Sequence, residues 1–193
     1  MSQLNPATPA VGVIGGGQLA RMMTPPAINL GINIKVFAEA EGSSAALATT
    51  QVGDYNQLSV VREFAKTVDV ITFDHEHVPL SVLEALEAEG VSVQPPSKAL
   101  AFAQNKLSMR KRLGALGMPM PDWAEIQDAA TLSAFIEAHD GVAILKTPIG
   151  GYDGKGVRVV RSADDAADWL ANLANFGGSL LAEEKVDFVR ELA

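Results

Sequence analysis

The stretch from Gly141 to Val160 most constrains the fold, because it places two apolar runs around a loop rich in glycine and charge. The run 142–145 is short and apolar, and the run 157–160 alternates apolar and basic residues, so both are typical of strands. The loop between them contains Gly150, Gly151, Asp153, Gly154, Lys155 and Gly156. Glycines permit positive φ and let backbone N–H groups approach an anion. The stretch predicts a hairpin with a phosphate-binding loop.

A solvated loop is the alternative reading of this stretch. Glycine-rich hairpin loops are common, and a lysine at the end of a strand is usually hydrated. The order of residues also differs from that of a P-loop, in which the lysine follows the last glycine and opens a helix. The spacing alone therefore leaves both readings open.

Composition limits the classes of ligand. The chain has 193 residues, 48% of them hydrophobic, a net charge of −8 and no cysteine. Such a charge argues against binding nucleic acid or an anionic membrane through the overall field. The lack of cysteine excludes disulfides, a thiolate zinc site and a cysteine nucleophile. No run approaches the roughly 20 apolar residues of a membrane helix, so we expect a cytoplasmic protein with small-molecule ligands.

The first half of the chain predicts an α/β domain with a mainly parallel sheet. Strands are expected at 10–14, 32–37, 50–52, 69–73 and 91–93, and helices after Gly17 and around 42–48, 58–66 and 79–89. Pro25 and Pro26 are expected to interrupt the first helix. Alternating strands and helices with short connections favour right-handed βαβ units.

Two segments of this half are candidate binding sites. The turn Gly15–Ala20 follows a strand and precedes a helix in the pattern G-x-G-x-x-A, which directs backbone N–H groups at an anion. Glu39 or Glu41, about 20 residues further on, leaves a nicotinamide dinucleotide open as a ligand. The segment 74–77, D-H-E-H, ends another strand. It offers Glu76 for substrate contact or a cap for the helix that begins at Pro79, and a metal site is improbable because the histidines and the carboxylates would face opposite sides of an extended strand.

The second half predicts a smaller α+β domain. Pro95 and Pro96 indicate a domain boundary near residue 97. One helix is expected from 97 to 116, with a solvated basic face formed by Arg110, Lys111 and Arg112. Further strands are expected at 123–126 and 179–182 and helices at 129–139 and 163–175, beside the hairpin described above.

The run G-G-Y-D-G-K-G, Gly150–Gly156, resembles the loop of ATP-grasp enzymes, and among them the ATP-dependent carboxylases of purine biosynthesis. The segments G-G-G-Q-L-A-R-M and Q-N-K-L also resemble that family, although Lys106 stands where the family has arginine. Lysine keeps the charge but loses the bidentate fork. The resemblance implies a Rossmann-like preATP-grasp domain at 1–97, a connecting helix and small ATP-grasp domain at 98–186, and the start of a catalytic domain at 187–193.

The resemblance also assigns roles to residues. For ATP binding it implies Lys106, Lys146, Gly151, Tyr152, Asp153, Gly154, Lys155, Gly156, Val157, Glu183, Glu184, Lys185, Val186 and Glu191. For the ribonucleotide substrate it implies Gly15, Gly17, Gln18, Leu19, Arg21 and Glu76. Tyr152, Asp153 and Lys155 are also the expected catalytic residues.

The family's reaction implies three small-molecule substrates: ATP, bicarbonate and aminoimidazole ribonucleotide. The products are the carboxyamino ribonucleotide, ADP and phosphate. The family uses Mg²⁺, whose ligands we expect in a large domain that this chain barely begins, so no metal residue is assigned here. We expect a homodimer, and no activity from this chain alone. The alternatives are another ATP-grasp carboxylate-amine ligase, a noncatalytic nucleotide-binding module and a dinucleotide-dependent oxidoreductase.

Overall fold

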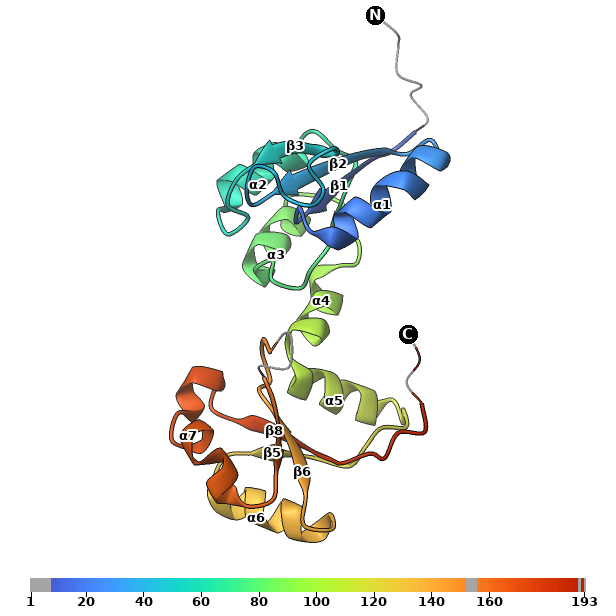
Figure 1. Ribbon diagram of the computed structural model, residues 1–193. Helices are drawn as coiled ribbons and strands as arrows, with labels where there is room; N and C mark the ends of the chain where they lie inside the picture. Colours follow the sequence, from blue (N-terminus) through green and yellow to red (C-terminus); the bar gives the residue numbers. More distant parts are fainter. Residues whose placement is uncertain (1–7, 152–155, 191, 193) are drawn as a thin grey trace, which may run out of the picture. The chain divides into compact units, whose positions relative to one another are not determined.

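The computed structural model describes residues 8–151, 156–190 and 192, and the chain forms two compact units (Figure 1). The first unit extends to Ala101 and the second begins at Phe102. This division falls inside helix α4 (Ser97–Gln104), four residues after the position at which the sequence suggests a boundary. Each unit has its own sheet, so each is described by itself.

The first unit contains a parallel sheet, as the sequence predicts, with four of the five expected strands. Its strands are β1 (Ala10–Ile14), β2 (Asn33–Ala38), β3 (Thr49–Val52) and β4 (Val70–Phe73), in the order β3-β2-β1-β4. All three pairings are parallel. Strand β1 is central, so the turn that follows it lies among the carboxyl ends of its neighbours. In open parallel sheets, ligands bind at that edge.

Helices cover both faces of the parallel sheet. Because side chains alternate along a strand, neighbouring residues of β1 face opposite sides. Val13 packs with Ala20 of α1 (Gln18–Asn29) on one face. Ile14 belongs to a larger core on the other face, to which α2 (Leu58–Ala65) and α3 (Leu80–Ala88) contribute.

Three details of the first unit differ from the sequence predictions. Helix α1 continues through Pro25 and Pro26 and ends at Asn29, where the N–H of Leu30 donates to Pro26 O at 3.0 Å. The segment 42–48 forms turns rather than a helix, because its backbone bonds close over three residues, as from Ala48 N to Ala45 O at 2.9 Å. The segment 91–93 makes only an isolated bridge, between Val93 and Ile71.

The second unit contains a four-stranded antiparallel sheet. Its strands are β5 (Trp123–Ile126), β6 (Ala143–Lys146), β7 (Val157–Val160) and β8 (Leu180–Glu184), in the order β5-β8-β6-β7. Strands β6 and β7 pair from Ala143↔Val160 to Lys146↔Val157, which confirms the predicted hairpin. Strand β8 continues two residues beyond its predicted end.

The two faces of this sheet have different coverings (Figure 1). The core face packs against α6 (Ala129–Ala138) and the segment containing α7 (Ala167–Leu170). The other face carries polar side chains of β5, β6 and β8, and residues of α5 (Lys106–Ala115) bind them. We call this second surface the open face. Trp123 lies opposite Glu183 in the β5–β8 register, so both side chains belong to the open face.

Two predicted helices of the second unit are interrupted. The helix expected from 97 to 116 breaks at Asn105, whose side chain accepts a hydrogen bond from Ser108 N at 3.0 Å and caps α5. The helix expected at 163–175 becomes a 3₁₀ turn (Ala163–Ala166), α7, and a second 3₁₀ turn (Leu173–Phe176). Within residues 8–151, 156–190 and 192, every helix is too short or too polar to span a bilayer.

Candidate functional site

Lys146, the last residue of β6, forms an ion pair with Glu183 of β8. The two side chains share the open face because Glu183 pairs with Ile144, two residues before Lys146. Arg110 of α5 binds the same carboxylate from the helix side: its Nε donates to Glu183 Oε1 at 2.6 Å, and its Nη2 contacts the same oxygen. Lys146 bonds the other oxygen, Oε2. We call these three residues the Glu183 triad.

The Glu183 triad is largely shielded from solvent. The side chains of Glu183, Arg110 and Lys146 are 5%, 16% and 24% exposed. Two cations and one carboxylate give the triad a formal charge of +1. A partly buried cationic group at the end of a strand suits an anionic ligand, because low exposure reduces screening.

Glycine-rich segments meet directly beyond Lys146. Thr147 N donates to Gly156 O at 3.0 Å, so the two ends of the loop are joined by a backbone bond. Gly151 has φ +89°, and a Cβ on Gly156 would stand 2.4 Å from Gly151 Cα. Only glycine fits at this close approach. Lys106 also binds here: its Nζ donates to Gly150 O at 2.7 Å and its N–H to Pro148 O at 2.9 Å.

The structure thus brings together Lys106, Lys146, Gly151, Gly156 and Glu183 from the predicted ATP set. Val157 begins β7 and is 41% exposed. The remaining predicted loop residues and one predicted ribose contact lie outside the described residues: Tyr152, Asp153, Gly154, Lys155 and Glu191. Their roles stay predictions.

Glu184 is separated from Glu183, since adjacent strand residues face opposite sides of the sheet. Its side chain lies on the core face, near Asp122 and His139, and one ligand atom from each of these three residues falls within 4.8 Å of the others. His139 Nδ1 bonds Phe135 O at 2.8 Å, which leaves Nε2 directed to Asp122 at 3.6 Å. His139, Glu184 and Lys185 line a cavity of about 330 Å³. These three residues could hold a metal ion, although Asp122 is 81% exposed.

The predicted anion turn of the first unit is partly filled by the protein's own carboxylates. Gly16 N donates to Glu39 Oε2 at 3.0 Å, and Gly17 N donates to Asp74 Oδ2 at 2.8 Å. Ala20 N also faces Asp74 Oδ2, at 3.4 Å. An incoming anion would therefore meet the amides of the first helical turn at Gln18 and Leu19, since the N–H groups of a first turn have no partner within the helix.

Asp74 is built tightly into this turn. The residue is 9% exposed, and its Oδ1 is buried without a hydrogen-bond partner. A Cβ on Gly15 would stand 1.8 Å from that oxygen, and one on Gly17 would stand 2.6 Å from Oδ2. Glycines at these two positions therefore make room for the carboxylate, which is a reason for the motif in addition to anion binding.

Glu39, one of the two acidic residues that left a dinucleotide open as a ligand, binds the turn and His75. His75 Nδ1 accepts from His77 N at 3.2 Å, so Nε2 can donate to Glu39 Oε1 at 2.9 Å. Burial alone would raise the pKa of Glu39, but the N–H of Gly16 and the His75 ring outweigh it and lower the pKa below its usual value. The carboxylate therefore stays ionised.

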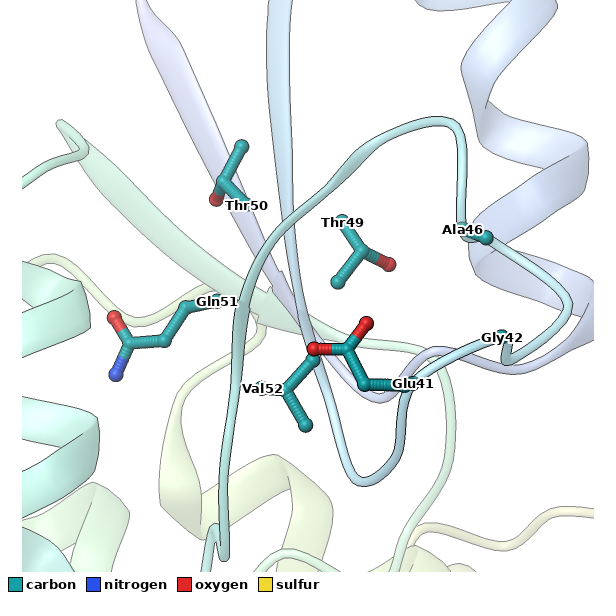
Figure 2. Close-up of a pocket in the computed structure, with 7 residues that line it drawn as sticks. All are labelled: Glu41, Gly42, Ala46, Thr49, Thr50, Gln51 and Val52. Atoms are coloured by element: carbon teal, nitrogen blue, oxygen red, sulfur yellow. The ribbon is translucent and has the colours of Figure 1, made fainter.

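The other predicted substrate residues surround the same turn. Gln18, Leu19 and Arg21 are exposed along the start of α1, and Gln18 Nε2 contacts Met22 Sδ at 3.9 Å. Glu76 is half-buried in the segment after β4. Figure 2 shows a further, small pocket in this unit, of about 170 Å³, lined by Glu41, Gly42, Ala46, Thr49, Thr50, Gln51 and Val52.

Arg110 is the site residue that sequence reasoning placed wrongly. The sequence suggests a solvated basic face on this helix, yet Arg110 is the member of that cluster that binds Glu183. A signal was available in its spacing, because residues four apart share one face of a helix and Arg110 follows Lys106 by four. Lys111, the next residue, does lie at the surface, 58% exposed and paired with Glu125.

Two family models divide the chain between them. The model for the ribonucleotide synthetase preATP-grasp domain matches residues 9–104, and the model for the ATP-grasp domain matches residues 111–193. The lysine and glycine-rich loop of the second unit and the parallel sheet of the first lie in the corresponding parts. These two matches define the class of the protein: a preATP-grasp domain is followed by an ATP-grasp domain.

Individual relatives show which ATP-grasp proteins this chain resembles. The chain is 44% identical over 187 residues to N5-carboxyaminoimidazole ribonucleotide synthase of Mycobacterium tuberculosis, covering 96% of this chain and 44% of the relative. It belongs to the family of these synthases. The ADP complex of an N5-carboxyaminoimidazole ribonucleotide synthetase is similar, with 30% identity, a TM-score of 0.81, and coverage of 98% of this chain and 50% of that chain.

A second similar structure contains two bound ligands. The Aspergillus clavatus N5-carboxyaminoimidazole synthase, in complex with ADP and 5-aminoimidazole ribonucleotide, is 31% identical with a TM-score of 0.78. The alignment covers 94% of this chain and 48% of that chain. The chain thus spans about half the length of the relatives that it matches.

Proposed function

We propose that this chain supplies the ribonucleotide-binding and nucleotide-binding parts of an ATP-dependent carboxylase. The reaction joins 5-aminoimidazole ribonucleotide and bicarbonate at the expense of ATP, giving the carboxyamino ribonucleotide, ADP and phosphate. The observation that carries the proposal is Lys146 beside the joined ends of the glycine loop, with Lys106 on the carbonyl of Gly150. The similarity to a synthase complexed with ADP and 5-aminoimidazole ribonucleotide supports the choice of substrates.

In the proposed reaction, a bicarbonate oxygen attacks the γ-phosphorus and the bond to the β–γ bridging oxygen breaks. The resulting carboxyphosphate releases phosphate and carbon dioxide, and the exocyclic amine captures the carbon and loses a proton. The protein's part is to position the reactants and to neutralise charge. Lys106, Lys146 and Lys155 are suited to the phosphates, and Tyr152 and Asp153 are proposed near bicarbonate or the amine.

The N–H groups of Gln18 and Leu19, at the start of α1, are proposed to bind the phosphate of the ribonucleotide, with Arg21 adding positive charge. Glu183, Lys185 and Val186 are proposed to line the adenine, and Glu191 the ribose. Glu183 and Glu184 would contribute through their backbone, since Arg110 and Lys146 bind the Glu183 carboxylate and the Glu184 side chain lies on the other face of the sheet.

Mg²⁺ does not fit the described residues around Lys146. Glu183 is the carboxylate of that cluster, and Arg110 and Lys146 already bind its two oxygens. We propose that the metal ligands belong to the part of the relatives that this chain does not match, and therefore that the chain alone has no synthase activity. Cytoplasmic location and a homodimer are proposed on the same family grounds.

Titration calorimetry with ATP and, separately, with NADH tests the proposal. We expect ATP to bind, and Lys146→Met to weaken binding at least tenfold, because it removes a charge that faces the phosphates. Lys111→Gln, a surface charge change on α5, serves as the matched control and should bind like the wild type. Binding of NADH but not ATP would instead support the dinucleotide-dependent oxidoreductase.

A further inference from the structure

The Glu183 triad gives one carboxylate two cationic partners of different kinds. Arg110 contacts Oε1 through two nitrogens of its planar guanidinium, and its side chain is 16% exposed. Lys146 contacts Oε2 through a single ammonium on a flexible chain and is 24% exposed. A guanidinium fork is a rigid partner, whereas an ammonium is a mobile point charge.

We propose that Arg110 is a positioning residue that neutralises Glu183 permanently, so that Lys146 can leave the carboxylate and move to an anionic ligand. The ligand is taken to be a nucleotide phosphate, so the inference rests on the proposed function for that identity. Without Arg110, the departure of Lys146 would leave a buried carboxylate unpaired, which is strongly unfavourable. With Arg110, the departure costs far less.

The neighbouring charges support this division of roles. Glu183 is 4% exposed, so water cannot replace a lost partner. Lys111, the next cation along α5, is bound to Glu125 at 2.7 Å and thus occupied elsewhere. The formal charge of the triad is +1 with Arg110 and zero without it, so the triad attracts an approaching phosphate more strongly while Arg110 is present.

Nucleotide titrations of a double-mutant cycle test the proposal. We expect Arg110→Gln to weaken ATP binding at least tenfold, equivalent to about 1.4 kcal/mol. In a Glu183→Gln background the same substitution should have little further effect, because the charge that Arg110 neutralises is then absent. Adding Glu183→Gln to Arg110→Gln should restore much of the affinity, since a neutral amide needs no counter-ion. A purely structural role for Arg110 would not give this rescue.

Lys111→Gln is the matched control, since it removes one charge from the adjacent position and should leave ATP affinity unchanged. Circular dichroism melts verify that each variant is folded. If Arg110→Gln does not fold, Arg110→Lys takes its place; it keeps the charge without the fork, and we expect an at least threefold loss that Glu183→Gln abolishes. Losses that simply add in the double variant would overturn the proposal while leaving ATP binding intact.

A second measurement needs no nucleotide. The rate at which an amine-reactive reagent labels Lys146, followed by peptide mass spectrometry, reports how often its ammonium leaves Glu183. We expect labelling at least threefold slower in Arg110→Gln than in the wild type, because Lys146 is then the one cationic partner of the carboxylate among the residues that the structure describes, and faster in Glu183→Gln. Equal rates in the wild type and Arg110→Gln would overturn the inference. Absence of ATP binding by the wild type would count against the proposed function instead.

Discussion

Removing the carboxylate of Asp74 should loosen the turn that follows β1. Its side chain is 3% exposed and accepts from the N–H groups of Gly17 and Ala20, at the start of α1. Asp74→Ala deletes both bonds and the negative charge at the helix N-terminus. Asp74→Asn keeps an oxygen acceptor but removes the charge.

The magnitude follows from three terms. A hydrogen bond to a charged group contributes about 1.5–3 kcal/mol, and a charge at a partly buried helix terminus up to about 2 kcal/mol. Against these stands the cost of burying a carboxylate whose Oδ1 has no hydrogen-bond partner, although His75 Nε2 lies 3.8 Å away. We therefore expect a net loss of about 2 kcal/mol for Asp74→Ala and about 1 kcal/mol for Asp74→Asn.

Hydrogen exchange with mass spectrometry can measure this loss in the first unit alone, because it resolves peptides of β1, β2 and α1. A loss of 2 kcal/mol corresponds to about 30-fold faster exchange in those peptides. Asp69→Ala is the matched control: its carboxylate also accepts a backbone N–H, from Ala10 at 2.7 Å, but at an exposed position. If Asp74→Ala exchanged no faster than Asp69→Ala, buried Asp74 would not be what holds the turn.

Two further predictions concern the glycine loop and the acid limb of stability. Gly156→Ala places a Cβ 2.4 Å from Gly151 Cα, so we expect at least tenfold weaker ATP binding by calorimetry; Gly114→Ala, whose Cβ meets nothing closer than 3.9 Å, should bind normally. The pKa of Glu39 is lower in the folded protein than its usual 4.5, so its contribution to stability is present above about pH 4.5 and is lost as the pH falls through the folded-state pKa. Urea unfolding from pH 6 to pH 3 should therefore show a shallower acid dependence in Glu39→Gln, and an unchanged dependence would contradict this role.

Much of the fold could be predicted from local pattern, and the errors have physical causes. Alternating strands and helices predicted the parallel sheet, and the glycine-rich hairpin predicted β6 and β7 correctly. The prediction of one long helix was wrong at Asn105, where the side chain that caps α5 also marks the end of α4. The prediction that Pro25 and Pro26 interrupt α1 was also wrong. Packing of α1 on the sheet stabilises a helix that propensity alone would break.

The candidate site could be predicted only where the type of a residue and its place in a local pattern are enough to identify it. Lys146 stands at the end of a strand that is evident in the sequence, and it does end β6. The partnership of Arg110 with Glu183 spans 73 residues, so no local pattern contains it. The carboxylates on the glycine turn could not be predicted for the same reason, because Asp74 and Gly17 are 57 residues apart. The sequence gives no sign that a carboxylate accepts the hydrogen bond of an amide that could bind an anion.

The register of β5 and β8 gives the site a built-in optical probe. Trp123 stands opposite Glu183 on the open face, whereas the other tryptophan, Trp169, packs with the core of the opposite face beneath the guanidinium of Arg158, 4.3 Å from the ring centroid. Indole emission depends on the charge and polarity nearby. In a Trp169→Phe background, the remaining emission would come from one ring beside the Glu183 triad, so rapid-mixing fluorescence could time the arrival of a phosphate without any attached dye.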